Sequence, residues 1–164
     1  RGLAISAALE RDWPTAQTLL DSATTLFVRA GGPAWRYTLH EDQATLALRR
    51  GDGARAAREV DSALVGFLPS QGAVRYRLFA ARAEAHVLQG DTAAAARALA
   101  QGAAALDAWR AELPTERLRA LAFQARADFE TPSAERAIAA IAASGRVAEA
   151  FALAEGRRAR ALRD

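Results

Sequence analysis

The sequence contains no cysteine among its 164 residues. Disulfide bonds, thiolate metal ligands and a cysteine nucleophile are therefore excluded within this chain. Lysine and asparagine are missing too, so all 22 basic residues are arginine. Because almost nothing titrates between histidine and tyrosine in such a chain, a net charge of only +3 produces a high isoelectric point, which overstates how basic the protein is.

Long apolar runs are also missing. No segment approaches the roughly 18 consecutive apolar residues of a membrane span, and the amino end lacks the basic segment and apolar core of a signal peptide. We therefore expect a soluble, cytoplasmic protein without a membrane partner. Because the sequence begins with Arg1 and not with methionine, we interpret it as a piece of a longer chain.

Acidic and basic residues are interspersed through most of the sequence. Six acids accompany six arginines between residues 51 and 108, and eight acids accompany ten arginines between residues 109 and 164. A nucleic-acid interface requires basic residues segregated on one face. The interspersed signs instead indicate a solvated surface and predict no nucleic-acid partner.

A repeat of 39 to 40 residues runs through the chain. The segment RDWPTAQTLL, which begins at residue 11, matches FETPSAERAI, which begins at residue 129. Between them lie RGDGARAAREV from residue 50 and QGDTAAAARAL from residue 89. The four segments place Asp12, Asp52, Asp91 and Glu130 at spacings of 40, 39 and 39 residues.

Each of these acids stands where a helix N-cap belongs, because its carboxylate can accept hydrogen bonds from the free amides of the next turn. Pro14 and Pro132 follow two residues after an acid, inside the first turn, where the missing N–H of proline costs little. The same register puts small or apolar residues at matching depths of each helix, where we expect them to pack against the preceding helix. These seam residues are Ala16, Leu20 and Ala23; Ala56, Val60 and Ala63; Ala95, Leu99 and Gly102; and Ala134, Ile138 and Ile141.

The pattern predicts an all-α fold without strands. Turn residues separate the helices at Gly31–Gly32–Pro33, at residues 69–72 and at Pro114. We expect one domain over residues 1–164, an α-solenoid of antiparallel helix pairs with about four units of 39–40 residues and a C-terminal helix. The predicted helices cover residues 2–11, 13–30, 34–50, 54–67, 72–89, 92–112, 115–130, 132–144 and 146–163.

This pattern resembles tetratricopeptide repeats. In that family a small residue lies midway along the first helix, Gly-Asp occupies the turn, and alanine follows five residues after the glycine. The period exceeds the family's usual length, and Arg11 and Phe129 replace the glycine in the first and fourth units. The resemblance implies stacked helix pairs that bind other proteins. The matching positions are Ala44, Gly51 and Ala56, and again Ala83, Gly90 and Ala95.

Residues 119–164 resemble the segment that closes the repeat array in bacterial CHAT-domain proteins, just before their caspase-like domain. The resemblance implies that this chain is the repeat arm of such a protein and that no catalytic residue lies within it. The family's histidine and cysteine cannot be carried over, because the chain has no cysteine. The matching residues are Gly145, Arg146, Glu149, Ala150, Phe151, Glu155, Arg158, Ala159, Arg160, Leu162 and Asp164.

The arginine-rich end is the candidate junction with a following domain. An alternative requires no function, because cations favour a helix C-terminus and Glu155 can pair with Arg158 three residues later. The candidate junction residues are Arg157, Arg158, Arg160 and Arg163.

The candidate binding face is the concave side formed by the first helix of each unit. Its mixed charges around apolar residues suit an extended peptide or a partner helix, since arginine forks can grip carboxylates. The chaperone-tail clamp of tetratricopeptide domains relies on lysine and asparagine and is therefore disfavoured. Alternatively, the face is merely solvated or contacts another domain of the same chain. The candidate residues are Thr38, Glu41, Thr45, Arg77, Ala80, Glu84, Arg119, Phe123 and Arg126.

The sequence offers little that could carry catalysis. His40, Glu41 and Asp42 are consecutive and point in different directions on a helix, so we predict no metal site. His86 falls at a packed repeat position, and no phosphate loop or nucleophile motif is present, so we predict no cofactor. The tryptophans Trp13, Trp35 and Trp109 lie near helix ends, where we expect packing between units.

Three functions remain open from the sequence. We favour a non-catalytic protein-interaction scaffold, the repeat arm of a CHAT-type protein that recruits or senses a protein or peptide partner. The chain could instead be the interaction or sensor arm of a bacterial transcriptional regulator or signalling protein. A small enzyme that uses His40 or His86 is the third hypothesis.

Overall fold

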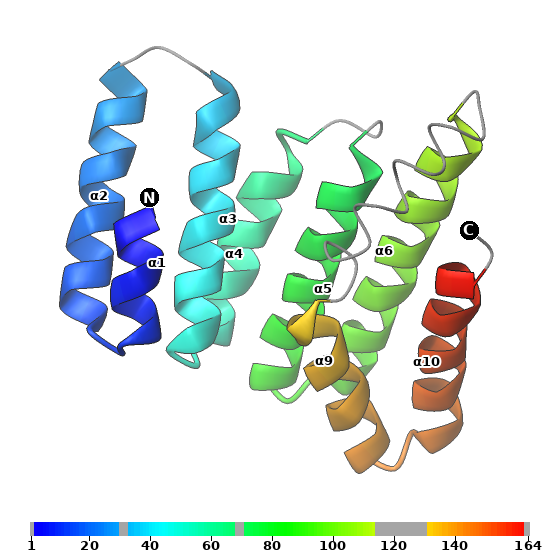
Figure 1. Ribbon diagram of the computed structural model, residues 1–164. Helices are drawn as coiled ribbons and strands as arrows, with labels where there is room; N and C mark the ends of the chain where they lie inside the picture. Colours follow the sequence, from blue (N-terminus) through cyan, green and yellow to red (C-terminus); the bar gives the residue numbers. More distant parts are fainter. Residues whose placement is uncertain (1, 30–32, 68–70, 114–130, 163–164) are drawn as a thin grey trace.

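The computed structural model is all-helical in the residues that it describes, which are 2–29, 33–67, 71–113 and 131–162 (Figure 1). These ranges contain no β-strand, so the predicted all-α class is confirmed for them. The predicted helix over residues 115–130 lies outside them. The described helices are α1 (Gly2–Leu9), α2 (Trp13–Arg29), α3 (Pro33–Arg49), α4 (Gly53–Leu64), α5 (Gly72–Leu88), α6 (Thr92–Ala111), α9 (Pro132–Ala143) and α10 (Val147–Leu162).

The same turn closes four helix hairpins. In each turn a residue with positive φ follows the first helix, and the next amide donates a hydrogen bond to the carbonyl five residues back. In the second hairpin, for example, Gly51 has a φ of 77° and the Asp52 amide lies 2.9 Å from the Ala47 oxygen. The positive-φ residues of the four turns are Arg11, Gly51, Gly90 and Gly145.

Three of the four predicted N-caps are confirmed. Asp12 Oδ1 accepts a hydrogen bond from the Thr15 amide at 3.2 Å, at the start of α2. Asp52 and Asp91 do the same for α4 and α6, at 2.9 and 2.8 Å. The carboxylates accept hydrogen bonds from amides that have no partner within the helix, and their negative charge interacts favourably with the positive end of the helix dipole.

The fourth N-cap prediction, Glu130, is wrong. The N-cap of α9 is Thr131, whose hydroxyl accepts a hydrogen bond from the Ala134 amide at 3.4 Å. Pro132 is the first residue of α9, where its preset φ and missing N–H fit best. In α2 the first residue is Trp13 and proline comes second, so the two similar segments start their helices one residue apart.

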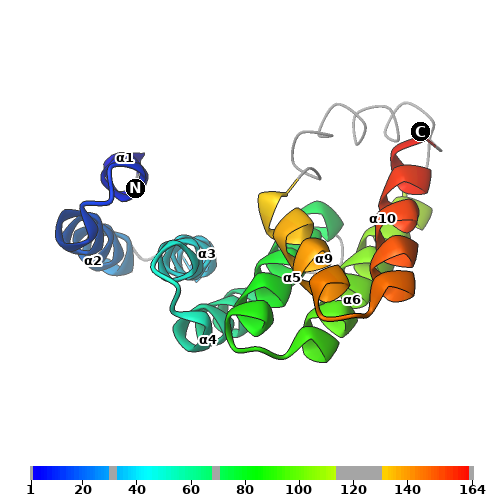
Figure 2. The same cartoon turned by 90° about the horizontal axis from the view of Figure 1, so that it is seen from below.

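The helices pack mainly on their neighbours in the chain. The hairpins α1–α2, α3–α4 and α5–α6 follow one another, and α2 packs against α3 as α4 packs against α5. Figures 1 and 2 show these helices side by side in chain order.

The last hairpin differs from the predicted register, which made residues 132–144 a second helix. In the structure α9 packs against α5 and α6, much as α5 packs against α3 and α4, and α10 packs against α9 and α6. Gly145, with a φ of 90°, turns the chain back after α9. This turn makes α9 the first helix of its hairpin and α10 the second.

The core is built from the predicted seam. Small residues let the helices approach closely: a Cβ added at Gly102 would lie only 2.9 Å from the Phe79 Cβ across the α5–α6 hairpin. One seam residue differs, since Ile138 is partly buried while its neighbour Ala137 is fully buried. The buried seam residues are Ala16, Leu20, Ala23, Ala56, Val60, Ala63, Ala95, Leu99, Gly102, Ala134 and Ile141.

Candidate functional site

The described part of the predicted binding face lies on α3 and α5. Ala80 is only 1% exposed and belongs to the core around α5, α6 and α9, so it contributes no binding surface. Thr38 is half-buried, whereas Thr45 is exposed and donates its hydroxyl hydrogen to the Glu41 carbonyl at 3.0 Å. Arg119, Phe123 and Arg126 lie outside the described residues.

Two other residues of this face form an ion pair with each other. Arg77 Nη2 on α5 lies 3.2 Å from Glu41 Oε1 on α3. The pair spans 36 residues of sequence and joins the first helices of two successive hairpins. Both side chains are between one fifth and one third exposed, so the pair is only partly shielded from solvent.

Glu84 is held more firmly. Its side chain is 10% exposed, and Arg136 on α9 approaches it with two nitrogens: Nη2 lies 2.9 Å from Oε2, and Nε contacts Oε1. This fork-to-carboxylate geometry is the strongest form of the arginine–carboxylate pair. The hydrogen bond that Arg136 donates to Glu84 raises the pKa of the Arg136 guanidinium, while burial opposes the shift.

Sequence reasoning placed Glu84 on the binding face but missed Arg136. The two residues are 52 positions apart, which is not a multiple of the repeat, and the predicted register put Arg136 on a second helix. Only the packing of α9 against α5 brings them together. Glu84 therefore fastens the last hairpin to the rest of the fold.

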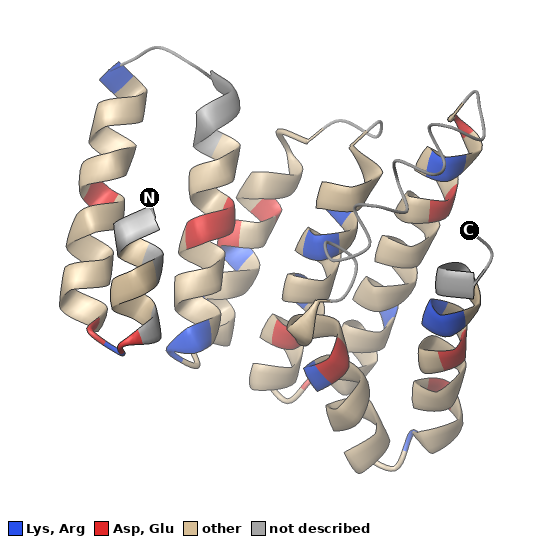
Figure 3. Cartoon of the chain, viewed as in Figure 1, with Lys and Arg blue, Asp and Glu red and all other residues tan. Residues whose placement is uncertain are grey.

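Figure 3 shows the charges on the side of the molecule that includes α3, α5 and α9. Among the described residues, both acidic and basic side chains occur on these helices.

A polar network beside this face joins α2, α3 and α4. His40 Nδ1 lies 2.8 Å from Glu59 Oε2 on α4. Arg55 Nη2 donates to Gln43 Oε1 at 3.0 Å, and Gln17 Nε2 donates to the same oxygen at 3.3 Å. No sequence pattern indicates this network, because its members come from three helices.

His40 thus has its partner on another helix and not in the adjacent acids of the sequence. Among the described residues, no three histidine, aspartate or glutamate side chains are grouped so that they could hold a metal ion. His86, the second histidine, is half-buried near the end of α5. Its burial lowers its pKa below 6.5, and the charge of Arg82 lowers the pKa further.

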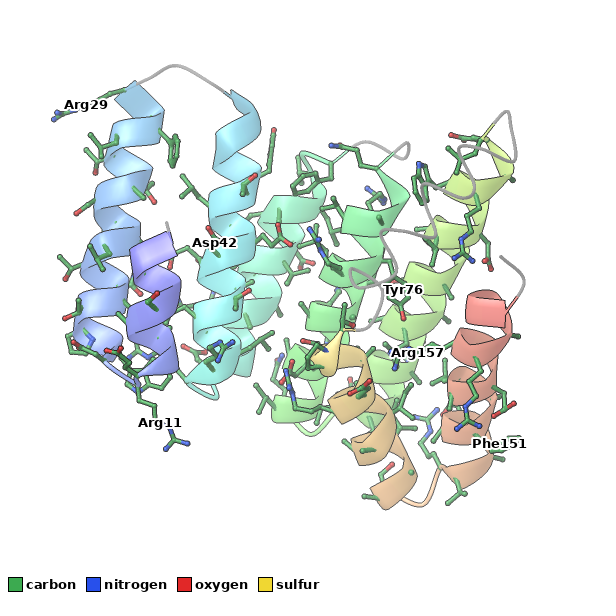
Figure 4. All side chains as sticks on the ribbon, viewed as in Figure 1. Arg11, Arg29, Asp42, Tyr76, Phe151 and Arg157 are labelled. Carbon is green, nitrogen blue, oxygen red and sulfur yellow. The ribbon has the colours of Figure 1, made fainter. Side chains whose placement is uncertain are left out.

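The junction arginines that are described form contacts within the fold. Arg157 Nη2 on α10 lies 3.8 Å from Glu135 Oε1 on α9. Arg158 pairs with Glu155 at 3.2 Å, which confirms the predicted pairing three residues apart. Phe151 is 66% exposed, on the side of α10 turned away from α9 (Figure 4). Arg163 and the side chain of Arg160 lie outside the described part of the chain.

The tryptophans divide between two kinds of packing. Trp13 is half-buried against Ala8, Ala16 and Leu46, between the first and second hairpins, as predicted. Trp109 packs inside one hairpin, since a Cβ added at Gly72 of α5 would lie 2.2 Å from its Cβ. The side chain of Trp35 is outside the described residues.

No protein-family profile, curated protein sequence or solved structure matches this chain. None of the described helices is both long and apolar enough to cross a membrane.

Proposed function

We propose that this chain is a non-catalytic scaffold for protein–protein interaction, with the stacked helix pairs of a tetratricopeptide-like α-solenoid. The observation that carries the proposal is the recurrence of one turn and one cap, at Asp12, Asp52 and Asp91, between helices that pack on their chain neighbours. Arrays built in this way offer long surfaces made from the first helix of each unit.

The binding face in this proposal is formed by Thr38, Glu41 and Thr45 on α3 and by Arg77 and Glu84 on α5. A partner's carboxylate can take the place of Glu41 on Arg77, and a partner's arginine or lysine can take the place of Arg77 on Glu41. Glu84 stays bound to Arg136, so it lies at the edge of the face and does not exchange its ion-pair partner. We therefore propose a peptide or helix that carries both signs of charge as the partner.

Site-specific photocrosslinking in the full-length protein tests this face. A photoreactive amino acid at the exposed Thr45 of α3 should capture a protein partner, while the same group at the exposed Arg58 of α4 should not. Arg77→Gln should weaken capture at position 45 without unfolding the protein. Equal capture at both positions, or capture unchanged by Arg77→Gln, would contradict the proposal.

We further propose that the parent protein is of the CHAT type and that α10 leads towards its caspase-like domain. The support is the likeness of residues 119–164 to the segment that closes such arrays, together with the Arg157–Glu135 contact, which holds α10 on α9. Arg158, Arg160 and Arg163 would then lie near the following domain.

The sequence of the parent gene beyond Asp164 decides this point. An α/β region that carries a histidine and, later, a cysteine, each at the end of a predicted strand, is the expected result. A DNA-binding or kinase segment would instead make the chain an arm of a transcriptional regulator or signalling protein and would leave the scaffold function in place.

A further inference from the structure

An open pocket of about 490 Å³ lies where α1 turns into α2 and where α3 ends. Ala8, Arg11, Trp13 and Arg49 line it. Figure 4 shows Arg11 at the turn between α1 and α2, at the lower end of the first hairpin in that view. None of the four residues belongs to the proposed protein-binding face.

The pocket exists because the first repeat has a tryptophan where the second has a glycine. Trp13 corresponds to Gly53, 40 residues later. A Cβ added at Gly53 would lie 2.6 Å from the Ala85 oxygen and 2.8 Å from the Leu88 Cβ, so α4 can begin this close to α5 only with glycine. Because the indole of Trp13 stands at the matching position, the start of α2 cannot lie as close to α3 as α4 lies to α5. Space therefore remains between α2 and the end of α3.

Two guanidinium groups occupy positions that carry no charge in the next repeat. Arg11 corresponds to Gly51, and Arg49 corresponds to Leu88. Both arginines are exposed, and neither forms an ion pair with another residue that the structure describes. The nearby carboxylate of Asp12 accepts the Thr15 amide. Glu10, on the other side of Arg11, is also exposed.

Arg11 occupies its position at an energetic cost. Its φ of 61° is left-handed, whereas the three equivalent turns use glycine. An L-residue with a side chain loses about 1 kcal/mol or more in this conformation. Backbone strain that a smaller residue would relieve is a reason to look for a role of the side chain.

We propose that this pocket binds a small ligand that joins an oxyanion, either a carboxylate or a phosphate, to a flat apolar group. The guanidinium forks of Arg11 and Arg49 match the two oxygens of such an anion. The indole of Trp13 offers an apolar wall to the flat group. The volume falls within the range of small-molecule sites, roughly 300 to 1,000 Å³. The site does not depend on the proposed scaffold function.

The test uses the whole chain and four probes: phenyl phosphate, benzoate, inorganic phosphate and benzyl alcohol. Binding is followed through the indole N–H signal of Trp13 in nitrogen-15 NMR spectra, assigned with Trp13→Phe. Phenyl phosphate or benzoate should shift this signal saturably, and the tighter of the two identifies the oxyanion. Benzyl alcohol, which lacks the charge, and inorganic phosphate, which lacks the ring, should bind more weakly.

Two variants connect binding to the pocket. Arg11→Gly and Arg49→Gln should each weaken binding about tenfold, since each removes a charge-assisted hydrogen bond. Arg50→Gln, at an exposed arginine that does not line the pocket, should leave affinity unchanged. Because glycine relieves the strain at position 11, loss of binding in Arg11→Gly cannot be ascribed to unfolding.

Three results would overturn the proposal. The first is the absence of a saturable shift with either charged aromatic probe up to about 10 mM, because a dissociation constant above that value is too weak for a ligand site. The second is equal binding of benzyl alcohol, and the third is unchanged affinity in both arginine variants.

Discussion

At the scale of single residues, the turn between paired helices shows how the same geometry accepts different side chains at different cost. Gly51, Gly90 and Gly145 adopt a positive φ without a steric penalty, and Arg11 adopts it with one. A Cβ added at Gly90 would meet no atom within 4 Å, so the cost of a side chain there is purely one of backbone conformation. A substitution at such a turn position therefore reports the cost of the backbone conformation without a contribution from side-chain packing.

Arg11→Gly should raise the free energy of unfolding by about 1 kcal/mol, because it removes the left-handed penalty of a side chain. Gly90→Ala should lower it by a similar amount for the converse reason. Urea denaturation of both variants, followed by circular dichroism, measures the two changes. A loss of stability in Arg11→Gly would show that its side chain has stabilising contacts that outweigh the strain.

His86 should make stability depend on pH between neutral and mildly acidic conditions. Its folded pKa lies below the unfolded value of 6.5, chiefly through burial and then through Arg82, against the opposing charges of Asp91 and Asp61. The unfolded state therefore binds the proton more tightly. The stabilising contribution is complete above pH 6.5 and is lost as the pH falls through the folded pKa.

The comparison of wild type with His86→Gln isolates this contribution. The free energy of unfolding of wild type minus that of His86→Gln, measured between pH 7.5 and 5, should decrease as the pH falls, because glutamine does not titrate. If the free energies of unfolding of the two proteins changed with pH in parallel, the pH dependence of stability would arise from a group other than His86.

At the scale of helices, ion pairs between side chains help to hold each helix against helices of other hairpins. Glu41 and Arg77 join α3 to α5, and Glu84 and Arg136 join α5 to α9. The second pair is stronger because Glu84 is nearly buried and two guanidinium nitrogens contact its carboxylate. α9 also buries Ala134, Ala137 and Ile141 against α5 and α6.

Arg136→Gln should lower the free energy of unfolding by about 1 to 2 kcal/mol, because it leaves the nearly buried carboxylate of Glu84 without its charged partner. The effect stays moderate because the Arg136 side chain is 58% exposed to solvent. Arg158→Gln is the matched control, since it removes an exposed pair within one helix and should cost less than about 0.5 kcal/mol. Equal effects in urea denaturation would mean that the Glu84 pair does not fasten α9.

At the scale of the whole molecule, helices that pack on chain neighbours should open from the ends. α5 packs against α3, α4, α6 and α9, whereas α1 packs mainly against α2 and, to a lesser extent, against α3. A helix with fewer packed partners should need less free energy to open locally.

Hydrogen exchange measured on the intact chain should therefore show faster exchange in α1 than in α5 and α6. The amides of α5 and α6 should exchange with the free energy of global unfolding, while those of α1 exchange through local fraying. Uniform protection from α1 to α6 would show that these helices unfold as one cooperative unit.

Much of the local structure could be predicted from the sequence. The starts of the described helices agree with the predicted ones to within one residue, and the caps at Asp52 and Asp91 were identified from spacing alone. Capping and turn formation depend on residues within about four positions, so they are encoded locally. The wrong cap at Glu130 has the same origin, because Thr131 competes for the role one residue later.

The sequence by itself therefore determined the all-helical class, the hairpin turns at Gly51 and Gly90 and most of the buried seam. Only the tertiary structure decided that α9 packs as a first helix on α5 and α6, that Glu84 pairs with Arg136, and that the Trp13 indole leaves a pocket beside two arginines. The physical reason is distance along the chain. Contacts between residues tens of positions apart depend on how closely whole helices approach, and that is set by the packing of every side chain between them.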